Sequence, residues 1–306
     1  MIKYAKWLEN NTHLLTNQLA IVVGGTGSIG KEIINYLLHL KAKVVIGARN
    51  IEKASALKKQ MLLKYPDAKI YIEYVDLSKL ESIDKFQLAI DSKYQKADIF
   101  INNAGVYHLP KRMSTDGYEI HFATNALGSY YLSKKIVYDL KINAKMIYVS
   151  SMSAKFFKVD FTDIQSYHCK NKMKIYSRSK NIMTSNAISF KRVLMEHSIH
   201  VNIVHPGVCA TELFGKSHSK LFMYTIYPLM KLFFHSPKKA ALSIIKGIFI
   251  DTKDNEWIVP RGLFEASGYP VIRKMTNKIC NDEKIEKLDI IMNDIIIKHN
   301  KNNSGE

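Results

Sequence analysis

Cysteine and long apolar runs are both scarce in this chain of 306 residues. Its three cysteines, Cys169, Cys209 and Cys280, are too few and too scattered for a disulfide framework or a cysteine-based zinc site. The longest apolar stretch, Leu221–Phe234, is interrupted by Lys231 and is too short to span a bilayer. These absences predict a protein of a reducing compartment. We expect it to be cytoplasmic, either free or peripheral to a membrane.

Acidic residues are also few. The 27 Asp and Glu stand against 45 Lys and Arg, which gives a formal net charge of +18. A balance this basic can serve nucleic acid, an anionic membrane surface or an anionic small molecule. However, the lysines are spread along the chain among apolar residues, which favours a solvated surface. Because no motif combines basic and aromatic side chains, we predict no nucleic-acid partner.

Strand and helix patterns alternate along the first two thirds of the chain. Short apolar runs typical of buried parallel strands occur at 19–23, 43–47, 69–75, 98–101, 145–149 and 201–204. Segments with helical spacing lie between them, at 31–40, 52–65, 80–94, 118–140 and 176–197. This alternation predicts an α/β fold with a doubly wound parallel sheet. Ligands of such sheets bind at the carboxyl ends of the strands.

The chain contains no internal repeat and no low-complexity linker, so we expect one domain. It should cover residues 17–300, after an N-terminal preamble at 1–16 and before a frayed tail at 301–306. A small helical lid over the substrate is expected at about 211–240. Residues 283–299 have the spacing of an amphipathic helix. That helix docks either on the domain or on a second subunit, so a homo-oligomer stays open.

A glycine-rich turn connects the first strand to the first helix. Gly24, Gly27 and Gly30 permit a tight turn and a close approach of the backbone to a pyrophosphate, which the helix N-terminus favours. Hydroxyl groups can add donors there. The turn therefore predicts dinucleotide binding, with contacts from Gly24, Thr26, Gly27, Ser28, Ile29 and Gly30.

The next two strands end in residues suited to an adenosine moiety. The second strand ends at Ala48, Arg49 and Asn50, where a selective NAD site would place an acidic residue. An arginine fork suits a 2′-phosphate, so we predict NADP(H) in preference to NAD(H). At the third strand, Asp76 and Leu77 either meet the adenine or, for Asp76, cap the following helix.

Further motifs follow in a recognisable order. They are Asn102-Asn103-Ala104-Gly105, Asn125, Val149-Ser150-Ser151, Tyr176 with Lys180, and His205-Pro206-Gly207-Val208 with Thr211. Their order resembles the short-chain dehydrogenase/reductase family over roughly residues 19–211. The resemblance implies a Rossmann fold and an NAD(P)-dependent oxidoreductase that interconverts an alcohol and an aldehyde or ketone. Hydride chemistry then belongs to the cofactor.

The main catalytic candidates lie at the end of the predicted strand 145–149 and on the predicted helix 176–197. Tyr176 and Lys180 are four apart on a helix and share one face, so the ammonium is expected to lower the tyrosine pKa. Tyr176 can then exchange a proton with a substrate oxygen. The resemblance implies that Ser151 polarises that oxygen, that Lys180 holds the nicotinamide ribose, and that Asn125 anchors a water. Ser150 competes for the serine role, and the family pattern favours Ser151.

The resemblance also assigns further residues to the cofactor. Pro206 and Gly207 turn the chain after the sixth strand, and Thr211 can bond the carboxamide. The other expected contacts are Asn103, Ala104, Gly105 and Val208. No ligand spacing predicts a metal site, and His205, His218 and His235 are assigned to packing or to the surface.

The long gap between Ser151 and Tyr176 is similar to that of the retinol-dehydrogenase-like branch, whose members act on lipophilic alcohols and aldehydes. Apolar residues gather at 152–161 and 213–234. They predict a pocket for a lipophilic substrate, a lid packed on the sheet, or a membrane contact. A rival function is a non-catalytic NADP(H)-sensing module, which would need no Ser151, Tyr176 and Lys180.

Overall fold

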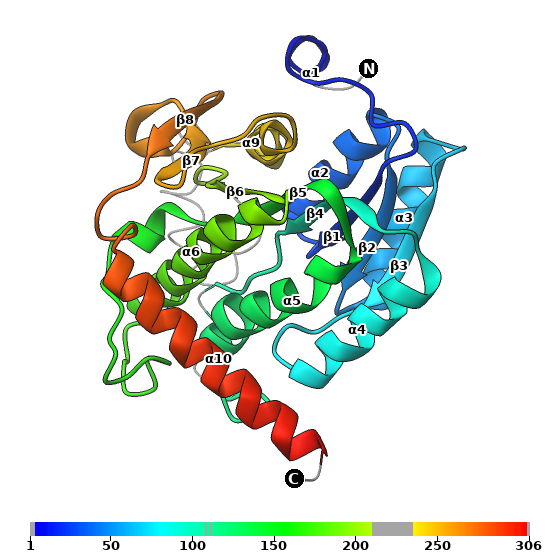
Figure 1. The fold of residues 1–306 in the computed structure, drawn as a ribbon. Coiled ribbons are helices and arrows are strands. Elements are labelled where there is room, and N and C mark those ends of the chain that lie inside the picture. The colour runs from blue at the N-terminus through cyan, green and yellow to red at the C-terminus, as the bar shows by residue number, and fades with distance from the viewer. Residues whose placement is uncertain (1–3, 108, 111, 210–234, 305–306) are drawn as a thin grey trace, which may run out of the picture.

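The computed structural model describes residues 4–107, 109–110, 112–209 and 235–304. Their centre is an eight-stranded sheet in the order β3-β2-β1-β4-β5-β6-β7-β8 (Figure 1). All neighbouring strands are parallel except β8, which runs antiparallel to β7. The strands are β1 (Leu19–Val23), β2 (Lys43–Ala48), β3 (Ile70–Tyr74), β4 (Ala97–Asn102), β5 (Leu140–Val149), β6 (His200–Val204), β7 (Glu256–Pro260) and β8 (Pro270–Lys274). The predicted doubly wound α/β fold is confirmed, while β7 and β8 were not predicted.

Helices cover both faces of the sheet, so the central strands are buried on both sides (Figure 1). One layer contains α2 (Ser28–His39), α3 (Ile51–Lys64) and α9 (Pro237–Phe249). The other contains α4 (Leu80–Lys93), α5 (Gly128–Ile136), α6 (Lys172–Glu196) and α10 (Asp282–Ser304). In β1, Ala20 and Val22 pack on the first layer, whereas Ile21 packs on the second. The two-residue period of a strand therefore divides one apolar run between two cores.

The predicted helix over 118–140 corresponds to one continuous helical segment over 120–139, which contains three helix types. A π-helical turn, Phe122–Leu127, leads into α5, and a 3-10 turn at Val137–Asp139 ends it. Strand β5 begins at Leu140 instead of Lys145, because Leu140 pairs with Ala97 before a register shift. Apolar spacing thus predicted the helical segment, but neither its π and 3-10 turns nor the early start of β5.

Both ends of the chain are more ordered than the sequence suggested. A short helix, α1 (Ala5–Asn11), lies within the preamble, and Leu8 and Leu15 are buried in the core. Helix α10 continues to Ser304, so the first four residues of the expected tail are helical. Its apolar face packs on the domain. The expected lid at 211–240 lies mostly outside the described residues.

No helix in the described part of the chain is both long and apolar enough to cross a bilayer.

Candidate active site

The glycine turn is built for close backbone contact. Gly24 has a φ of +83°, and a Cβ there would lie 2.6 Å from backbone atoms of Ala104. A Cβ on Gly30 would lie 2.3 Å from the carbonyl oxygen of Gly24. Asn103 fixes the turn from β4, because its amide donates to the Gly24 carbonyl at 2.9 Å. Only glycine fits these two positions, and the first N–H groups of α2 are left for an anion.

A cavity of about 290 Å³ opens beside this turn at the carboxyl ends of β1, β2 and β3. Most of the predicted cofactor contacts line it: Gly24, Thr26, Gly27, Ser28, Ile29, Arg49, Asp76, Leu77, Asn103, Ala104 and Gly105. Thr124 also lines it and was missed by the sequence analysis. A glycine cradle, an exposed arginine and a carboxylate fit the pyrophosphate, ribose and adenine parts of a dinucleotide.

Three predicted cofactor contacts have other structural roles. Gly30 lies beneath the turn, where its missing side chain lets the helix approach. Asn50 caps α3, since its side chain accepts the Lys53 N–H at 2.7 Å. Asp76 does line the cavity, and it also accepts from both the N–H and the hydroxyl of Ser78. Asp76 therefore organises the turn before α4 and is not the cap of that helix.

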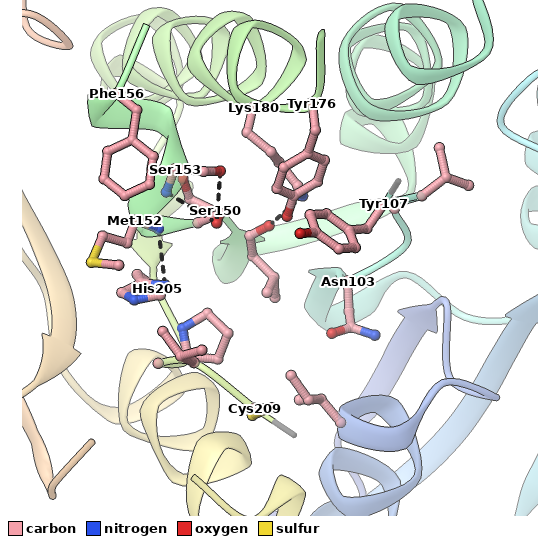
Figure 2. Close-up of a pocket in the computed structure, with 18 of the residues that line it drawn as sticks. Asn103, Tyr107, Ser150, Met152, Ser153, Phe156, Tyr176, Lys180, His205 and Cys209 are labelled. Atoms are coloured by element: carbon pink, nitrogen blue, oxygen red, sulfur yellow. Dashed lines mark hydrogen bonds between the residues drawn. The ribbon is translucent and has the colours of Figure 1, made fainter. Parts of the chain in front are cut away.

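A second cavity, also about 290 Å³, lies at the carboxyl ends of β4, β5 and β6 (Figure 2). It brings together Ser151, Tyr176 and Lys180 from two distant segments of the chain. Its wall also includes five further expected cofactor contacts: Asn103, Gly105, Pro206, Gly207 and Val208. Thr211 lies outside the described residues. Ile29 and Asn103 line both cavities, so the two form neighbouring parts of one site.

The two serines at the end of β5 have different hydrogen-bond partners. Ser150 is buried, and its hydroxyl is 2.6 Å from that of Thr184. Ser151 instead accepts from the Ser153 hydroxyl at 2.9 Å, and its own hydroxyl acts to lower the pKa of Tyr176. This arrangement supports Ser151 in the serine role. Ser153 also acts to lower the pKa of Tyr176, and no sequence motif singled it out.

The predicted effect of Lys180 on the tyrosine is not what the structure shows. Burial raises the pKa of Tyr176 to about 12, and the hydroxyl groups of Ser151 and Ser153 oppose that rise. The Lys180 ammonium donates to the Val149 carbonyl at 2.9 Å, and burial lowers its pKa to about 8. Helical spacing placed the two groups on one face, but desolvation dominates the pKa of each.

Asn125 lies in the π-helical turn and is fully buried. Its amide accepts the Val106 N–H at 2.7 Å and donates to the Val106 carbonyl at 2.9 Å and to Ser179 at 3.0 Å. A Cβ on Gly105 would lie 3.2 Å from Asn125 Oδ1 and 3.3 Å from Lys180 Nζ. Asn125 therefore fixes the loop after β4 beside Lys180, and its role in holding water stays a prediction.

Two aromatic rings of the cavity, those of Tyr107 and His205, make contacts that no sequence motif predicted. The ring of Tyr107 lies edge-on to that of Tyr176, with centroids 4.7 Å apart (Figure 2). His205 is buried rather than at the surface, and its Nδ1 accepts the Met152 N–H at 3.2 Å. Burial lowers the pKa of His205 to about 3, so the ring is neutral and can accept that bond.

No cluster of His, Cys, Asp or Glu in the described ranges could hold a metal.

The segment between β5 and α6 divides its apolar residues between two environments. Met152 and Phe156 line the cavity with Met173, whereas Val159 and Phe161 pack against the core. An ion pair of 2.9 Å between Arg178 and Asp160 ties the segment to α6. Part of the insertion thus forms an apolar wall, and part holds that wall in place. Residues 213–234 lie outside the described part.

The motifs, their place at the strand ends and the joined cavities agree with one family model. Residues 18–221 match the model of the short chain dehydrogenase family. The chain belongs to this family. It is an NAD(P)-dependent oxidoreductase that acts on CH–OH groups and interconverts alcohols and carbonyl compounds.

Individual proteins extend this similarity over most of the chain. Retinol dehydrogenase 14 of Mus musculus is 30% identical over 280 residues, 83% of each chain. Short-chain dehydrogenase TIC 32 A, a chloroplastic protein of Brassica napus, is 32% identical over 266 residues, 82% of each. The first of these bears out the predicted resemblance to retinol-dehydrogenase-like members.

Among solved structures, an uncharacterised protein from Mycobacterium Paratuberculosis has a TM-score of 0.73 and 20% sequence identity. The match covers 92% of this chain and 93% of that one. At this identity the similarity shows the shared fold alone.

Proposed function

We propose that this short-chain dehydrogenase uses NADP(H) to interconvert a lipophilic alcohol and its aldehyde or ketone, with proton transfer at the Tyr176 hydroxyl. The observation that carries the proposal is the grouping of Tyr176 with Ser151 and Ser153 on an apolar cavity that adjoins the glycine cradle. When bound, the cofactor supplies the hydride chemistry.

The protein residues would manage the substrate oxygen. With a pKa of about 12, Tyr176 is protonated at neutral pH, so it is ready to donate a proton to a carbonyl oxygen. Ser151 and Ser153 would orient that phenol and polarise the same oxygen. Lys180 beside them would hold the ribose hydroxyls of the nicotinamide half, as the family pattern suggests. The arrangement favours carbonyl reduction near neutral pH.

The preference for NADP(H) rests on the end of β2. Arg49 is exposed and lines the adenosine cavity next to Ala48, which has no carboxylate to repel a 2′-phosphate. Two charge-assisted hydrogen bonds from the arginine to the phosphate would distinguish the two cofactors. Lys53 is the nearest other basic residue in the sequence, and its side-chain ammonium is the alternative reader of the phosphate.

The lipophilic substrate is inferred from the cavity wall and from the relative. Apolar side chains dominate the described wall of the catalytic cavity: Ile29, Val106, Met152, Phe156, Met173, Val208 and Cys209. Phe156 is 49% exposed and Met173 38% exposed, so both present apolar surface at the site. A named retinol dehydrogenase among the similar proteins agrees with this chemistry.

The decisive experiment assays purified protein with NADPH and a homologous series of straight-chain aldehydes. We expect kcat/KM to rise with chain length, because each buried methylene contributes about 0.8 kcal/mol. Phe156→Ser should flatten the series, whereas Leu88→Ser, an exposed leucine on α4, should not. No reduction of any aldehyde or ketone would refute the catalytic proposal, and a flat series would refute the lipophilic pocket alone.

A further inference from the structure

The turn that carries Ser151 rests on a side chain from the helix behind it. Asn181 directly follows Lys180 on α6 and is 1% exposed. Its amide nitrogen donates to the carbonyl oxygen of Ala154 at 2.8 Å and to that of Phe157 at 3.3 Å. The Ala154 N–H in turn donates to the Ser151 carbonyl at 3.0 Å. Asn181 therefore holds the turn that orients the two serines.

A lysine of the C-terminal helix determines how that amide is oriented. Lys284, in the first turn of α10, donates to Asn181 Oδ1 at 3.0 Å. Its other two protons go to the carbonyl oxygens of Lys278 and Ile279, each at 2.8 Å. An ammonium has three N–H donors and no acceptor, so every proton has a partner.

This arrangement excludes the flipped amide. An ammonium can only donate, so Oδ1 of Asn181 must face Lys284 and its NH₂ group must face the serine turn. A flipped amide would set Oδ1 against the carbonyl oxygens of Ala154 and Phe157, with no proton between them. The position of Lys284 is itself fixed, because Ile285 and Leu288 on the same helix are buried in the main core.

We propose that Asn181 and Lys284 are positioning residues that couple the start of α10 to the geometry of the Ser151 turn. The inference rests on the proposed function, since it assumes that Ser151 and Tyr176 act together. Neither Asn181 nor Lys284 is among the described residues that line the catalytic cavity. They act through the turn, by holding Ser151 and Ser153 against the tyrosine hydroxyl.

Lys284→Met tests the coupling in the full-length protein. Without the ammonium, Asn181 Oδ1 keeps only the Ser185 hydroxyl as a donor, at 3.5 Å, so the amide holds the serine turn less firmly. We expect kcat for NADPH-dependent aldehyde reduction to fall about tenfold to a hundredfold, as small misplacements of catalytic groups do. The NADPH dissociation constant should stay within twofold. Asn181→Asp keeps the acceptor for Lys284 and removes the two donors, so it should lose a similar factor in kcat.

Lys191 supplies the matched control. It is a second buried lysine, on α6, and donates to Thr252 Oγ1 at 2.6 Å and to the Lys253 carbonyl at 2.8 Å. Burial lowers the pKa of Lys191 and that of Lys284 to about 8, so Lys191→Met removes a comparable group away from the serine turn. It should lower the melting temperature like Lys284→Met and leave kcat within twofold.

An unchanged kcat in Lys284→Met and Asn181→Asp, or an equal loss in Lys191→Met, would overturn the positioning role. Full activity in Tyr176→Phe would instead overturn the proposed function, so the two failures are distinguishable.

Discussion

The two halves of the site are made in different ways. The adenosine half, at the ends of β1, β2 and β3, is built around the glycine turn, where a Cβ on Gly24 or Gly30 would collide with backbone atoms. The catalytic half, at the ends of β4, β5 and β6, depends on side chains from distant segments, including Ser151, Tyr176 and Asn125. Backbone geometry holds the first half, and burial sets the proton chemistry of the second.

The largest expected effect concerns the catalytic half. Tyr176→Phe removes the proton donor and keeps the ring packed against Tyr107. General acid catalysis contributes typically about 10²–10⁴-fold, so kcat for aldehyde reduction should fall by that order. Steady-state kinetics measures the loss, and NADPH titration by fluorescence should show unchanged binding. Near-normal turnover would remove Tyr176 from the mechanism.

In the adenosine half, by contrast, we expect a steric clash with the backbone to be the most disruptive change. Gly30→Ala places a Cβ 2.3 Å from the Gly24 carbonyl, so the turn must shift. We expect the free energy of unfolding to fall by about 1–3 kcal/mol, and NADPH affinity to fall with it. Gly27→Ala is the comparison, because its Cβ would come no closer than 3.6 Å to the same oxygen. Equal denaturant midpoints for both variants would contradict a turn held by close packing.

The pH dependence separates the two reaction directions. The Tyr176 pKa is raised to about 12, above its ordinary value, so the phenol stays protonated throughout the neutral range. Alcohol oxidation needs the phenolate, whose fraction rises about tenfold per pH unit below the pKa. We expect kcat/KM for oxidation to rise steeply from pH 6 to 8, while that for reduction stays flat. Below pH 8, Lys180 retains most of its charge. A plateau in oxidation below pH 8 would show a much lower tyrosine pKa.

The smallest expected effect is on cofactor choice. Arg49→Ala should lower kcat/KM with NADPH about tenfold and leave that with NADH nearly unchanged, because the discriminating contact is ionic and exposed. Ala48→Asp should add repulsion toward the 2′-phosphate and invert the preference. Paired kinetics with both cofactors measures the ratio. If Arg49→Ala keeps the parent ratio, a residue other than Arg49 reads the phosphate.

Local sequence was sufficient for the elements that depend on local rules. The apolar run 19–23 became β1 with the predicted bounds, since a fully buried parallel strand needs only continuous apolar residues. Gly24 and Gly30 predicted the glycine turn, because no other residue fits at these two positions. The order of motifs was enough to identify the family. These features follow from residue type and position along the chain.

Tertiary structure alone decided the electrostatics and the supports of the site. The spacing of Tyr176 and Lys180 predicted a lowered tyrosine pKa, but burial, which no local pattern reports, raises it. The contacts of Ser153, Tyr107 and His205 depend on segments brought together by the sheet. Lys284 reaches Asn181 across 103 positions of sequence. Residue types and motif order identify the central groups of the site, whereas packing brings in the remaining groups and decides which of them are desolvated and hydrogen-bonded.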